Sequence, residues 1–568
     1  MSHLTAAADR PQPWNAAAVR SITNKVMKII LYKSTLLVSL LLTVWACKPF
    51  DSLEPNPNVA SEESIVPPSL LLGRLTFDLY NGPGVADGRQ GRVYEGPWDQ
   101  VMRWNQFIVS NNLYYGGRNA YDWTVTATPY GMLKNVNKMD SLAVRFTGSK
   151  VNGYSALAKF FRAYSFIWLT QRSGDIPVSE AGLGLVNLTP KYDSQKAVYQ
   201  QSLQLLDDAN TDLGTILSGA TAGNAATTSI EGDILLGNSL AKWQKVINTY
   251  KMRVLVSLSK RADDTPDLNI KQKFADVLAN PAKYPLMASN ADNMVFTFNA
   301  AYDNYPHTPK DGNNNYQNVG STYLALTTAT QDPRTFVAAT PAPAELAKGK
   351  KIDDFSAYVG ADISLSIDDL NSNAGAKKYS NVNYNRYYTS YVGPEPYVII
   401  GFAELQFTIA EGLNRGWATG TTPANTYYTR GINASLAFYG LTEGAAYTIG
   451  DLTGKTLGAT TISIAKFLAD PGVVYKGDNA TGLEQILNQK YVALFQNSGW
   501  EAFYNFRRTG FPKTFVTTGA GINAAGRLPM RWQYPVDEST FNPENYKKAV
   551  SSQFGGSDDL NAMTWALK

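Results

Sequence analysis

Histidine and cysteine, which supply many nucleophilic, acid–base and metal-binding side chains, are nearly absent from this chain. Its 568 residues include two histidines, His3 and His307, and one cysteine, Cys47. A common zinc site, a Ser-His-Asp triad or a Cys-His pair each requires a correctly placed histidine. We therefore predict no catalytic residue, no metal site and no cofactor. We interpret His307 as a surface-loop histidine without a special role.

Pairs of carboxylates are the other possible source of chemistry, because a glycosidase needs two of them about 5–10 Å apart. Asp353 and Asp354 are adjacent, and Glu404 and Glu411 are separated by roughly 10 Å along a helix. The chain has 47 acidic residues, so such pairs are expected by chance. We predict that Glu404 and Glu411 belong to an internal polar network and that the protein is not an enzyme.

The single cysteine follows a segment that is typical of a secretory signal. Lys28 and Lys33 precede an apolar run from Leu36 to Val44, and Ala46 stands directly before Cys47. The run is too short for a membrane-spanning helix of about 20 residues. A small residue before cysteine resembles the lipobox of bacterial lipoproteins, and this resemblance implies cleavage and lipidation at Cys47. A signal anchor with an incidental cysteine is the alternative.

The flanking residues refine this interpretation. Trp45 departs from the lipobox pattern, although Val44 fits it. We expect translation to start at Met27 and residues 1–46 to be removed. Residues 47–65 are rich in Pro and Asn and are predicted to form a flexible tether. Asp51 and Glu54 resemble the signals that direct lipoproteins of Bacteroidetes-type bacteria to the outer face of the outer membrane.

Charge and composition describe the rest of the chain as an ordinary globular body. The formal charge of +4 is matched by the first 46 residues, which hold five basic residues and one acidic residue. The remainder is formally neutral, so overall charge gives no support for nucleic-acid binding. An apolar fraction of 44% and a charged fraction of 17% suit a sizeable core. We predict that residues 66–568 form a single body.

Apolar residues recur at helical spacing through most of this body. The clearest cases are 154–171 and 192–213, with Asp193 or Ser194 as the N-cap of the second. Further helices are predicted at 95–112, 124–146, 239–262, 402–418, 424–440, 483–498 and 500–507. Irregular sequence rich in Asn, Gly, Tyr and Thr fills 291–395, and short strands are possible at 294–298 and 514–517. The predicted fold class is mainly α: tetratricopeptide-like helical hairpins packed against an irregular, loop-rich ligand-binding half with a few short strands.

Several segments resemble the SusD/RagB family, in the order that the family has them. They are KFFRAYSFIWLTQRSGDIPVSEA (159–181), TPKYDSQKAVYQQSLQLLDDA (189–209), GDILLGNSLAKWQKVINTYKMRVLVSLSKR (232–261), DPR (332–334), AELQFTIAEGLNRGW (403–417), QKYVALFQNSGWEAFYNFRRTGFP (489–512) and RLPMRWQYPVDESTFN (527–542). Asn56-Pro57-Asn58 is similar to the leader of one SusD-like subgroup. The resemblance covers nearly all of the chain after Cys47, and it is weakest at 60–150 and 340–395.

The resemblance implies a function as well as a fold. Family members are lipoproteins that cover a TonB-dependent transporter of the SusC type and capture oligosaccharides, or in some members peptides, for import. It implies no covalent chemistry. Most motif residues are expected to be structural: Trp243, Trp417, Trp500 and Phe506 in the core, with Asp175, Asp332 and Arg334 as caps or braces of turns.

Ligand contacts are sought among aromatic and amide side chains in loops, because a sugar needs a flat apolar face together with planar donors and acceptors. Two regions qualify, 94–123 and 302–318. The predicted ligand-binding residues are Trp98, Trp104, Tyr115, Trp123, Tyr302, Tyr305, Asn313 and Tyr316; the same regions also hold Tyr94, Asn105, Tyr114, Arg118 and Asn304. The alternative is that Trp98 and Trp104 pack helix on helix and the asparagines solvate a long loop.

Three functions remain open at this point. The first is a surface lipoprotein that captures a nutrient, most simply an oligosaccharide, for a partner transporter. The second is a surface hydrolase of glycans or peptides with the same anchor. The third is a structural or adhesive surface protein.

Overall fold

The computed structural model describes residues 25–33, 66–81, 95–114, 117, 119–120, 123–125, 128–309, 315–419, 422–517 and 527–568. Val66–Lys568 form one compact unit, and residues 25–33 form a helix within the segment that precedes it. Among the described residues, no helix combines the length and the apolar character required to cross a bilayer.

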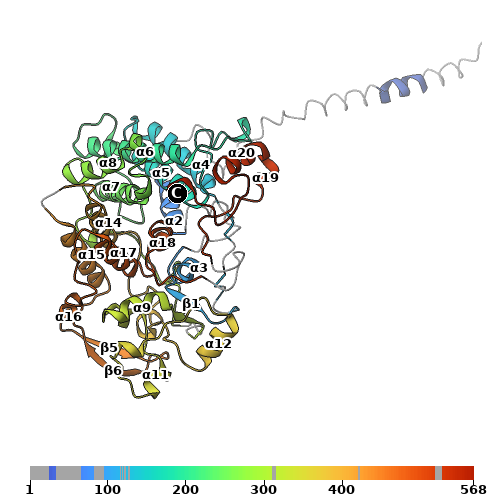
Figure 1. The fold of residues 1–568 in the computed structure, drawn as a ribbon. Helices are drawn as coiled ribbons and strands as arrows, with labels where there is room; N and C mark the ends of the chain where they lie inside the picture. The colour runs from blue at the N-terminus through green and yellow to red at the C-terminus, as the bar shows by residue number, and fades with distance from the viewer. Residues whose placement is uncertain are drawn as a thin grey trace, which may run out of the picture. The chain divides into compact units, whose positions relative to one another are not determined.

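Helices dominate the regular structure, which confirms the mainly α fold class (Figure 1). The longer ones are α2 (Ser69–Asn81), α4 (Tyr130–Thr147), α5 (Gly153–Ser173), α6 (Gln195–Leu217), α7 (Leu240–Ser257), α8 (Ile270–Ala279), α14 (Phe402–Asn414), α15 (Ala424–Phe438), α17 (Ala480–Ala493) and α20 (Pro543–Phe554). The shorter ones are α3 (Gln100–Trp104), α9 (Ser321–Ala329), α10 (Arg334–Ala338), α11 (Pro343–Ala347), α12 (Ile367–Gly375), α13 (Tyr384–Tyr387), α16 (Ile464–Leu468), α18 (Glu501–Thr509) and α19 (Glu538–Phe541). Single 3₁₀ turns are η2 (Gly184–Val186), η3 (Ala225–Thr228), η4 (Ser259–Arg261), η5 (Pro266–Leu268), η6 (Asn290–Asp292), η7 (Phe355–Ala357) and η8 (Trp565–Leu567).

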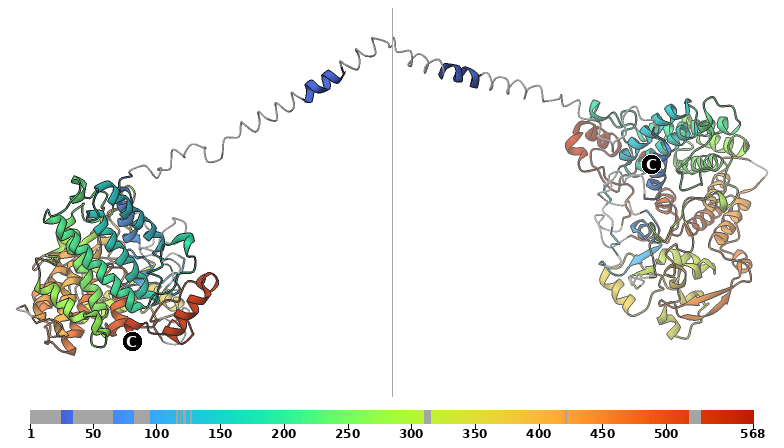
Figure 2. Two further views of the ribbon diagram at one scale, coloured as in Figure 1. Left: turned by 90° about the horizontal axis from the view of Figure 1, so that it is seen from above. Right: turned by 180° about the vertical axis from the view of Figure 1, so that it is seen from behind.

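The long helices pack as antiparallel neighbours, as in tetratricopeptide-like proteins. α4 packs on α5, α5 on α6 and α6 on α7, while α14 packs on α15, α17 and α7 (Figures 1 and 2). Each pair buries the apolar stripe that the helical spacing predicts. The irregular half of the body contains α9 to α13 and three antiparallel two-stranded ribbons: β1 (Ile108–Ser110) with β3 (Gln317–Val319), β2 (Met294–Phe296) with β4 (Tyr397–Ile400), and β5 (Ala446–Gly450) with β6 (Thr456–Thr461).

The ends of α5 and α6 show how local sequence sets these boundaries. The Asn152 side chain accepts from the backbone N–H of Ser155 at the start of α5, and Ser194 does the same for Ala197 at the start of α6. α5 ends at Ser173, and the following Gly174 has a φ of 96° that disfavours side chains; a Cβ there would lie 2.2 Å from Gln553 Oε1. For α6, the N-cap predicted as Asp193 or Ser194 is Ser194.

Two predictions about local structure are wrong. Residues 95–112 do not form one helix, because α3 ends at Trp104 and Gln106 takes a positive φ of 59° that turns the chain into β1. This turn is held by the Asn105 side chain, which donates to the carbonyl of Gly499 and accepts from the N–H of Phe503. Residues 514–517 form no strand, whereas the strand predicted from Met294 is β2.

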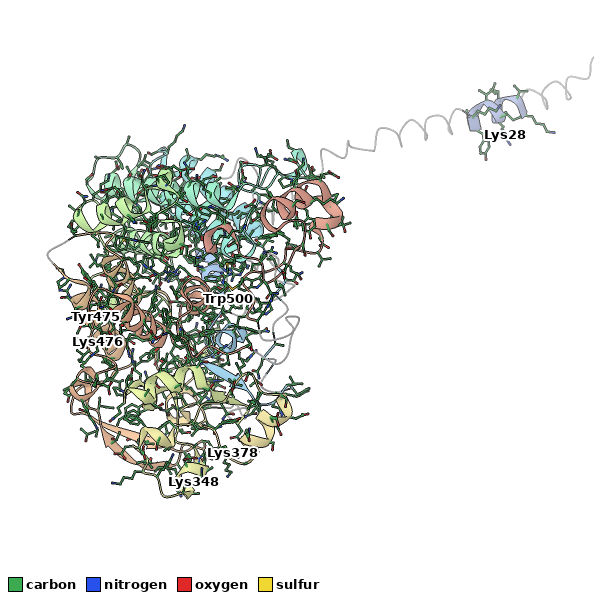
Figure 3. All side chains as sticks on the ribbon, viewed as in Figure 1. Lys28, Lys348, Lys378, Tyr475, Lys476 and Trp500 are labelled. Carbon is green, nitrogen blue, oxygen red and sulfur yellow. The ribbon has the colours of Figure 1, made fainter. Side chains whose placement is uncertain are left out.

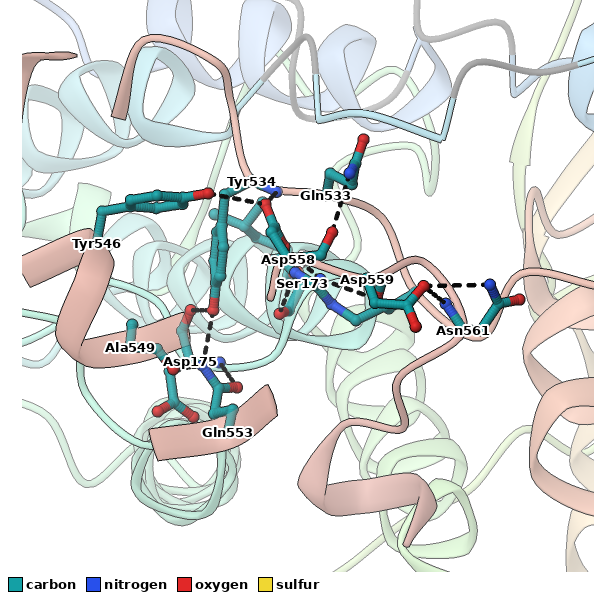
Figure 4. Close-up of polar contacts among 12 residues, drawn as sticks. Ser173, Asp175, Gln533, Tyr534, Tyr546, Ala549, Gln553, Asp558, Asp559 and Asn561 are labelled. Atoms are coloured by element: carbon teal, nitrogen blue, oxygen red, sulfur yellow. Dashed lines mark hydrogen bonds and ion pairs between the residues drawn. The ribbon is translucent and has the colours of Figure 1, made fainter. Parts of the chain in front are cut away.

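The turn after α5 is held by the C-terminal segment (Figure 4). The Asp175 carboxylate accepts from the backbone N–H of Gln195 at 2.8 Å. The backbone N–H of Asp175 donates to Gln553 Oε1, and its backbone carbonyl accepts from the Tyr534 hydroxyl at 2.7 Å. Burial raises the pKa of Asp175 to about 6. Asp175 braces a turn, as predicted from the sequence.

Buried ion pairs join the helices of the hairpin half. Arg253 on α7 donates to both oxygens of Glu404 on α14, with its Nε at 2.7 Å, and Arg508 on α18 donates to both oxygens of Glu411, at 2.5 and 2.9 Å. Burial alone would raise the pKa of Glu411, but Arg508 and Arg415 outweigh it and lower this pKa to about 2. The predicted internal polar network of Glu404 and Glu411 is confirmed, and neither carboxylate is exposed.

Replacing Glu411 by Gln should lower the free energy of unfolding by about 3–5 kcal/mol, because Arg508 is left buried without its counter-charge. The folded-state pKa of about 2 lies below the ordinary value of 4.5, so Glu411 stabilises the fold above pH 4.5 and loses this effect as the pH falls toward 2. Chemical denaturation of both proteins at pH 7 and pH 3 measures the difference. Glu484→Gln is the matched control, because its ion pair with Lys513 is exposed and should contribute at most about 1 kcal/mol. Equal losses in the two variants would contradict the account.

Candidate functional site

The two regions predicted to hold ligand meet through a buried aromatic contact. Nε1 of Trp98 donates to the Tyr305 hydroxyl at 2.7 Å, and the Trp98 ring lies 4.7 Å from the imidazole of His307, centroid to centroid. The backbone N–H of Trp98 donates to Gln496 Oε1 at 2.7 Å. Tyr305 fits here because Gly393 has no Cβ, which would lie 2.3 Å from the tyrosine ring. This contact joins the chain that enters α3 and β1 to the chain that leads from β2 to β3.

The same contact corrects part of the sequence prediction. Trp98, Trp104, Trp123 and Tyr305 are each at most 4% exposed. Trp104 and Trp123 pack edge to face at 4.6 Å, and Trp123 also contacts Trp532 at 4.8 Å. A ring that is covered on both faces has no surface on which a sugar can stack. These four residues are core residues. The alternative interpretation placed Trp98 and Trp104 in the core, although Trp98 precedes α3 and does not pack from a helix.

His307 also differs from its predicted place on the surface. Its side chain is buried between the rings of Trp98 and Tyr388, and the His307–Tyr388 centroid distance is 4.3 Å with the planes 14° apart. The aromatic neighbours of His307 along the sequence gave no indication of this stacking, because Tyr388 is some eighty residues away. His307 is a packed core residue.

Two tyrosines of these regions are exposed, and the chain presents both in the same way. Tyr114 is 87% exposed and Tyr302 is 90% exposed. The backbone N–H of Tyr114 donates to Asn112 Oδ1 at 3.0 Å, and the N–H of Tyr302 donates to Asn299 Oδ1 at 2.8 Å. Asn299 Oδ1 also accepts from the N–H of Ala301 at 3.1 Å. Each asparagine thus accepts from the residue two positions on and forms an Asx turn, which fixes the direction of the backbone. Residues 111–114 are called the Tyr114 loop and residues 299–304 the Tyr302 loop.

The Tyr114 loop is attached to the end of the β1–β3 ribbon by asparagines. The side chain of Asn111 donates to the carbonyl of Asn315 at 2.9 Å and to Asn318 Oδ1 at 2.7 Å, and its N–H donates to the carbonyl of Tyr316. Asn371 of α12 donates to the carbonyl of Asn111. These bonds place the half-buried Tyr316 next to the Tyr114 loop, so the structure brings these two predicted regions together at one end of the ribbon.

The Tyr302 loop closes on itself in a similar manner. The N–H of Asn299 donates to the carbonyl of Asp303 at 2.9 Å, and the Asn304 side chain donates to the carbonyl of Asn299 at 3.1 Å. Tyr305 follows directly and is anchored in the core, so the exposed Tyr302 is three residues from a fixed point. Tyr302, one of the predicted ligand-binding residues, is exposed. The predicted ligand residues Tyr115 and Asn313, like Cys47, lie outside the described residues.

The sequence prediction missed the asparagines that hold these loops. Asn112 and Asn299 each accept from the backbone N–H two residues on, of Tyr114 and Ala301, and an asparagine in a polar loop is the sequence signal of such an Asx turn. Asn111 and Asn318 gave no such signal, because they meet through strand pairing between residues 207 positions apart. Their role depends on tertiary structure.

A buried cation lies under the same region. Arg103 of α3 is 8% exposed, and a Cβ on Gly117 would lie 2.9 Å from its Nη2. Burial lowers the pKa of Arg103 to about 10, although the nearby Asp99 opposes this shift. Gly117 has a φ of 77°, so a glycine is required here both for the backbone and for the close approach.

Within the described residues, no group of three or more His, Cys, Asp or Glu side chains is arranged to hold a metal ion.

A family of known proteins matches this chain in sequence. Residues 89–535 match the sequence model of a family described as SusD-like and "Starch-binding associating with outer membrane". The chain belongs to the SusD-like family. Members of this family are nutrient-binding proteins associated with the outer membrane.

Solved structures of SusD-like proteins share the fold over most of the chain. A SusD homologue from Bacteroides fragilis is 30% identical, with a TM-score of 0.74 over 89% of this chain and 100% of its own. An outer-membrane protein from Bacteroides vulgatus, described as probably involved in nutrient binding, is 29% identical, with a TM-score of 0.70 over 89% of this chain and 100% of its own. A chitin-binding protein at 22% identity and a TM-score of 0.61, covering 88% of this chain and 99% of its own, shares the fold. No curated protein sequence matches the chain.

Removing the Tyr305 hydroxyl tests the structural role of the aromatic contact. Tyr305→Phe leaves Nε1 of the buried Trp98 without its acceptor and should lower the free energy of unfolding by about 1–3 kcal/mol. Tyr302→Phe is the matched control: it removes the same hydroxyl from an exposed ring and should change this free energy by at most about 0.5 kcal/mol. Urea denaturation compares the two. If Tyr305→Phe is as stable as the wild type, the hydrogen bond between Trp98 and Tyr305 does not stabilise the fold.

Proposed function

We propose that this SusD-like protein is a lipid-anchored receptor on the outer surface of the outer membrane, where it captures an oligosaccharide and delivers it to a TonB-dependent SusC-like transporter. The observation that carries the proposal is the pair of exposed tyrosines, Tyr114 and Tyr302, each held outward by an Asx turn in the irregular half of the body. The match to a starch-binding family supports a carbohydrate as the ligand.

The chemistry of the two loops suits a sugar. A tyrosine ring offers a flat apolar face to the C–H groups of a pyranose, and its hydroxyl stays available for hydrogen bonds. The asparagines in and around the Tyr114 loop add amide groups, which can both donate to and accept from sugar hydroxyls. Because the turns fix the backbone before a ligand arrives, little ordering is required on binding.

Binding without chemical conversion is part of the proposal. The carboxylate pair Glu404 and Glu411 is neutralised by arginines inside the body, where no glycosidic bond can reach it. The ligand is therefore expected to leave the protein unchanged, toward a transporter. A peptide is the competing ligand class, and it is included in the binding experiment below.

The tyrosines should matter for affinity and not for stability. Tyr114→Ala and Tyr302→Ala each remove a stacking ring and should weaken oligosaccharide binding by about two- to tenfold, the equivalent of about 0.5–1.5 kcal/mol. Isothermal titration calorimetry with maltoheptaose, cellohexaose, chitohexaose and a tryptic peptide mixture measures binding, and melting temperatures check the fold. Phe541→Ala is the control, because Phe541 is an exposed aromatic of α19, 72% exposed.

Two results would contradict this assignment. The first is unchanged affinity in both tyrosine variants for a ligand that the wild type binds. The second is release of shorter sugars from a polymer by the wild type, abolished by one carboxylate substitution, which would make the protein a hydrolase. Binding confined to the peptides would replace the oligosaccharide by a peptide as the captured nutrient.

The anchor is tested separately. In a bacterial host that processes lipoproteins, the mature protein should begin at Cys47, carry acyl chains by mass spectrometry and sediment with membranes. Cys47→Ser should leave the protein unacylated and release it from the membrane, because one cysteine carries all the proposed lipid. An unmodified Cys47 in the wild type would overturn the anchor, and membrane retention of Cys47→Ser would show another mode of attachment.

A further inference from the structure

A pocket in the irregular half shares no residue with the Tyr114 and Tyr302 loops, and it is called the second pocket because those loops form the first candidate site. It has a volume of about 470 Å³ and is lined by residues in and next to α9, α10, η7, β6 and α16. This volume falls within the range that small-molecule sites occupy in proteins, roughly 300–1,000 Å³. Its lining residues are Thr328, Ala329, Gln331, Pro333, Phe336, Asp353, Asp354, Phe355, Thr460, Thr461, Ser463 and Lys466.

Part of the pocket lining is apolar and aromatic. Pro333 and Phe336 are buried, and Phe355 is half-buried with its ring centroid 5.0 Å from that of Phe336. The half-buried Phe355 leaves part of its ring toward the pocket, where it can cover the apolar side of a small ring. A flat apolar surface of this kind is one of the two elements that carbohydrate sites combine.

The rim supplies the second element, a set of hydrogen-bonding groups. Asp353, Asp354 and Lys466 are exposed charged residues of the pocket lining. Asp354 accepts from the N–H of Ser356 at 2.8 Å, which lowers its pKa and keeps it charged. Threonine and serine hydroxyls from α9, β6 and the start of α16 complete the rim. Carboxylates accept from sugar hydroxyls, while ammonium and hydroxyl groups donate to them.

One wall is held rigidly by an ion pair that has no exposure to solvent. Asp332 and Arg334 are each 0% exposed, their side chains form a bidentate contact, and Arg334 also donates to Gln489 on α17. This pair fixes the turn at Gln331, which takes a positive φ of 55° although it is not glycine. The DPR motif thus serves a structural purpose, as predicted, and the turn it holds faces the pocket through Gln331 and Pro333.

From this combination we infer that the pocket is a second carbohydrate subsite, which takes one or two sugar units of the same oligosaccharide class. The inference rests on the proposed function in one respect, that the captured ligand is an oligosaccharide. A cationic group is the competing occupant, since Asp353 and Asp354 outnumber Lys466. The aromatic residues and the hydroxyl groups of the lining favour the sugar, because Lys466 in the same lining would repel a cation.

The test is a comparison of two double variants in calorimetric titrations with maltotriose, maltoheptaose, cellohexaose and chitohexaose. Asp353→Ala/Lys466→Ala removes opposite charges from the pocket rim, and Asp368→Ala/Lys476→Ala removes the same residue types from exposed positions that do not line it (Lys476 is labelled in Figure 3). Tyr114→Ala/Tyr302→Ala is titrated in parallel. All variants are first checked by melting temperature, and Thr461→Trp, which fills the pocket from an exposed position, provides an independent block.

We expect the wild type to bind a short sugar at two sites. The pocket variant and Thr461→Trp should each lose one of these sites or weaken it at least fivefold, while the control variant binds like the wild type. If the wild type and the pocket variants bind equally, the inference is overturned and the proposed function stands. If the tyrosine variant binds normally and the pocket variants lose all binding, the pocket is retained and the tyrosine site is overturned. Binding of a polylysine peptide that the pocket variants abolish, without any sugar binding there, would replace the sugar by a cation.

Discussion

The hydrogen bond between Trp98 and Tyr305 connects two parts of the chain that are 207 residues apart, and the exposed loops depend on it. Trp98 precedes α3 and β1, from which the Tyr114 loop extends, and Tyr305 directly follows the Tyr302 loop. Because both residues are buried among Tyr387, Phe298 and His307, neither loop can shift without opening an aromatic cluster. The core thereby holds two tyrosines at fixed places on a surface, and this arrangement suits capture of a ligand better than chemistry on it.

Helical hairpins supply the frame around this contact. Glu404 and Glu411 of α14 form ion pairs with Arg253 of α7 and Arg508 of α18. These carboxylates, the candidate acid–base pair of a hydrolase, are therefore neutralised inside the body. The DPR ion pair fixes a wall of the second pocket, and the Asp175 turn is held by the C-terminal segment. Residues of the family motifs thus act mainly on the structure, and the exposed tyrosines proposed for ligand contact lie in loops outside those motifs.

The sequence predicts local features of this protein well and contacts between distant residues poorly. Helical spacing and N-caps predicted α5, α6 and most other long helices, because these signals are local. The aromatic residues of 94–123 and 302–318 carry no periodicity, so nothing local distinguishes Trp98, whose backbone bonds to a residue 398 positions away, from Tyr114, which faces solvent. Composition indicated that the regions contain exposed aromatics; only tertiary contacts decide which ones. The Asx turns could be predicted from the sequence, since Asn112 and Asn299 lie in polar loops and each accepts from the N–H two residues on.

The most direct test is a crystal structure of the protein with the oligosaccharide that it binds most tightly. The account predicts an intact glycan with a pyranose ring stacked on Tyr114 or Tyr302, and unchanged positions for Trp98 and Tyr305 beneath. A glycan bound elsewhere with both tyrosines in solvent, or a cleaved sugar in the site, would contradict it.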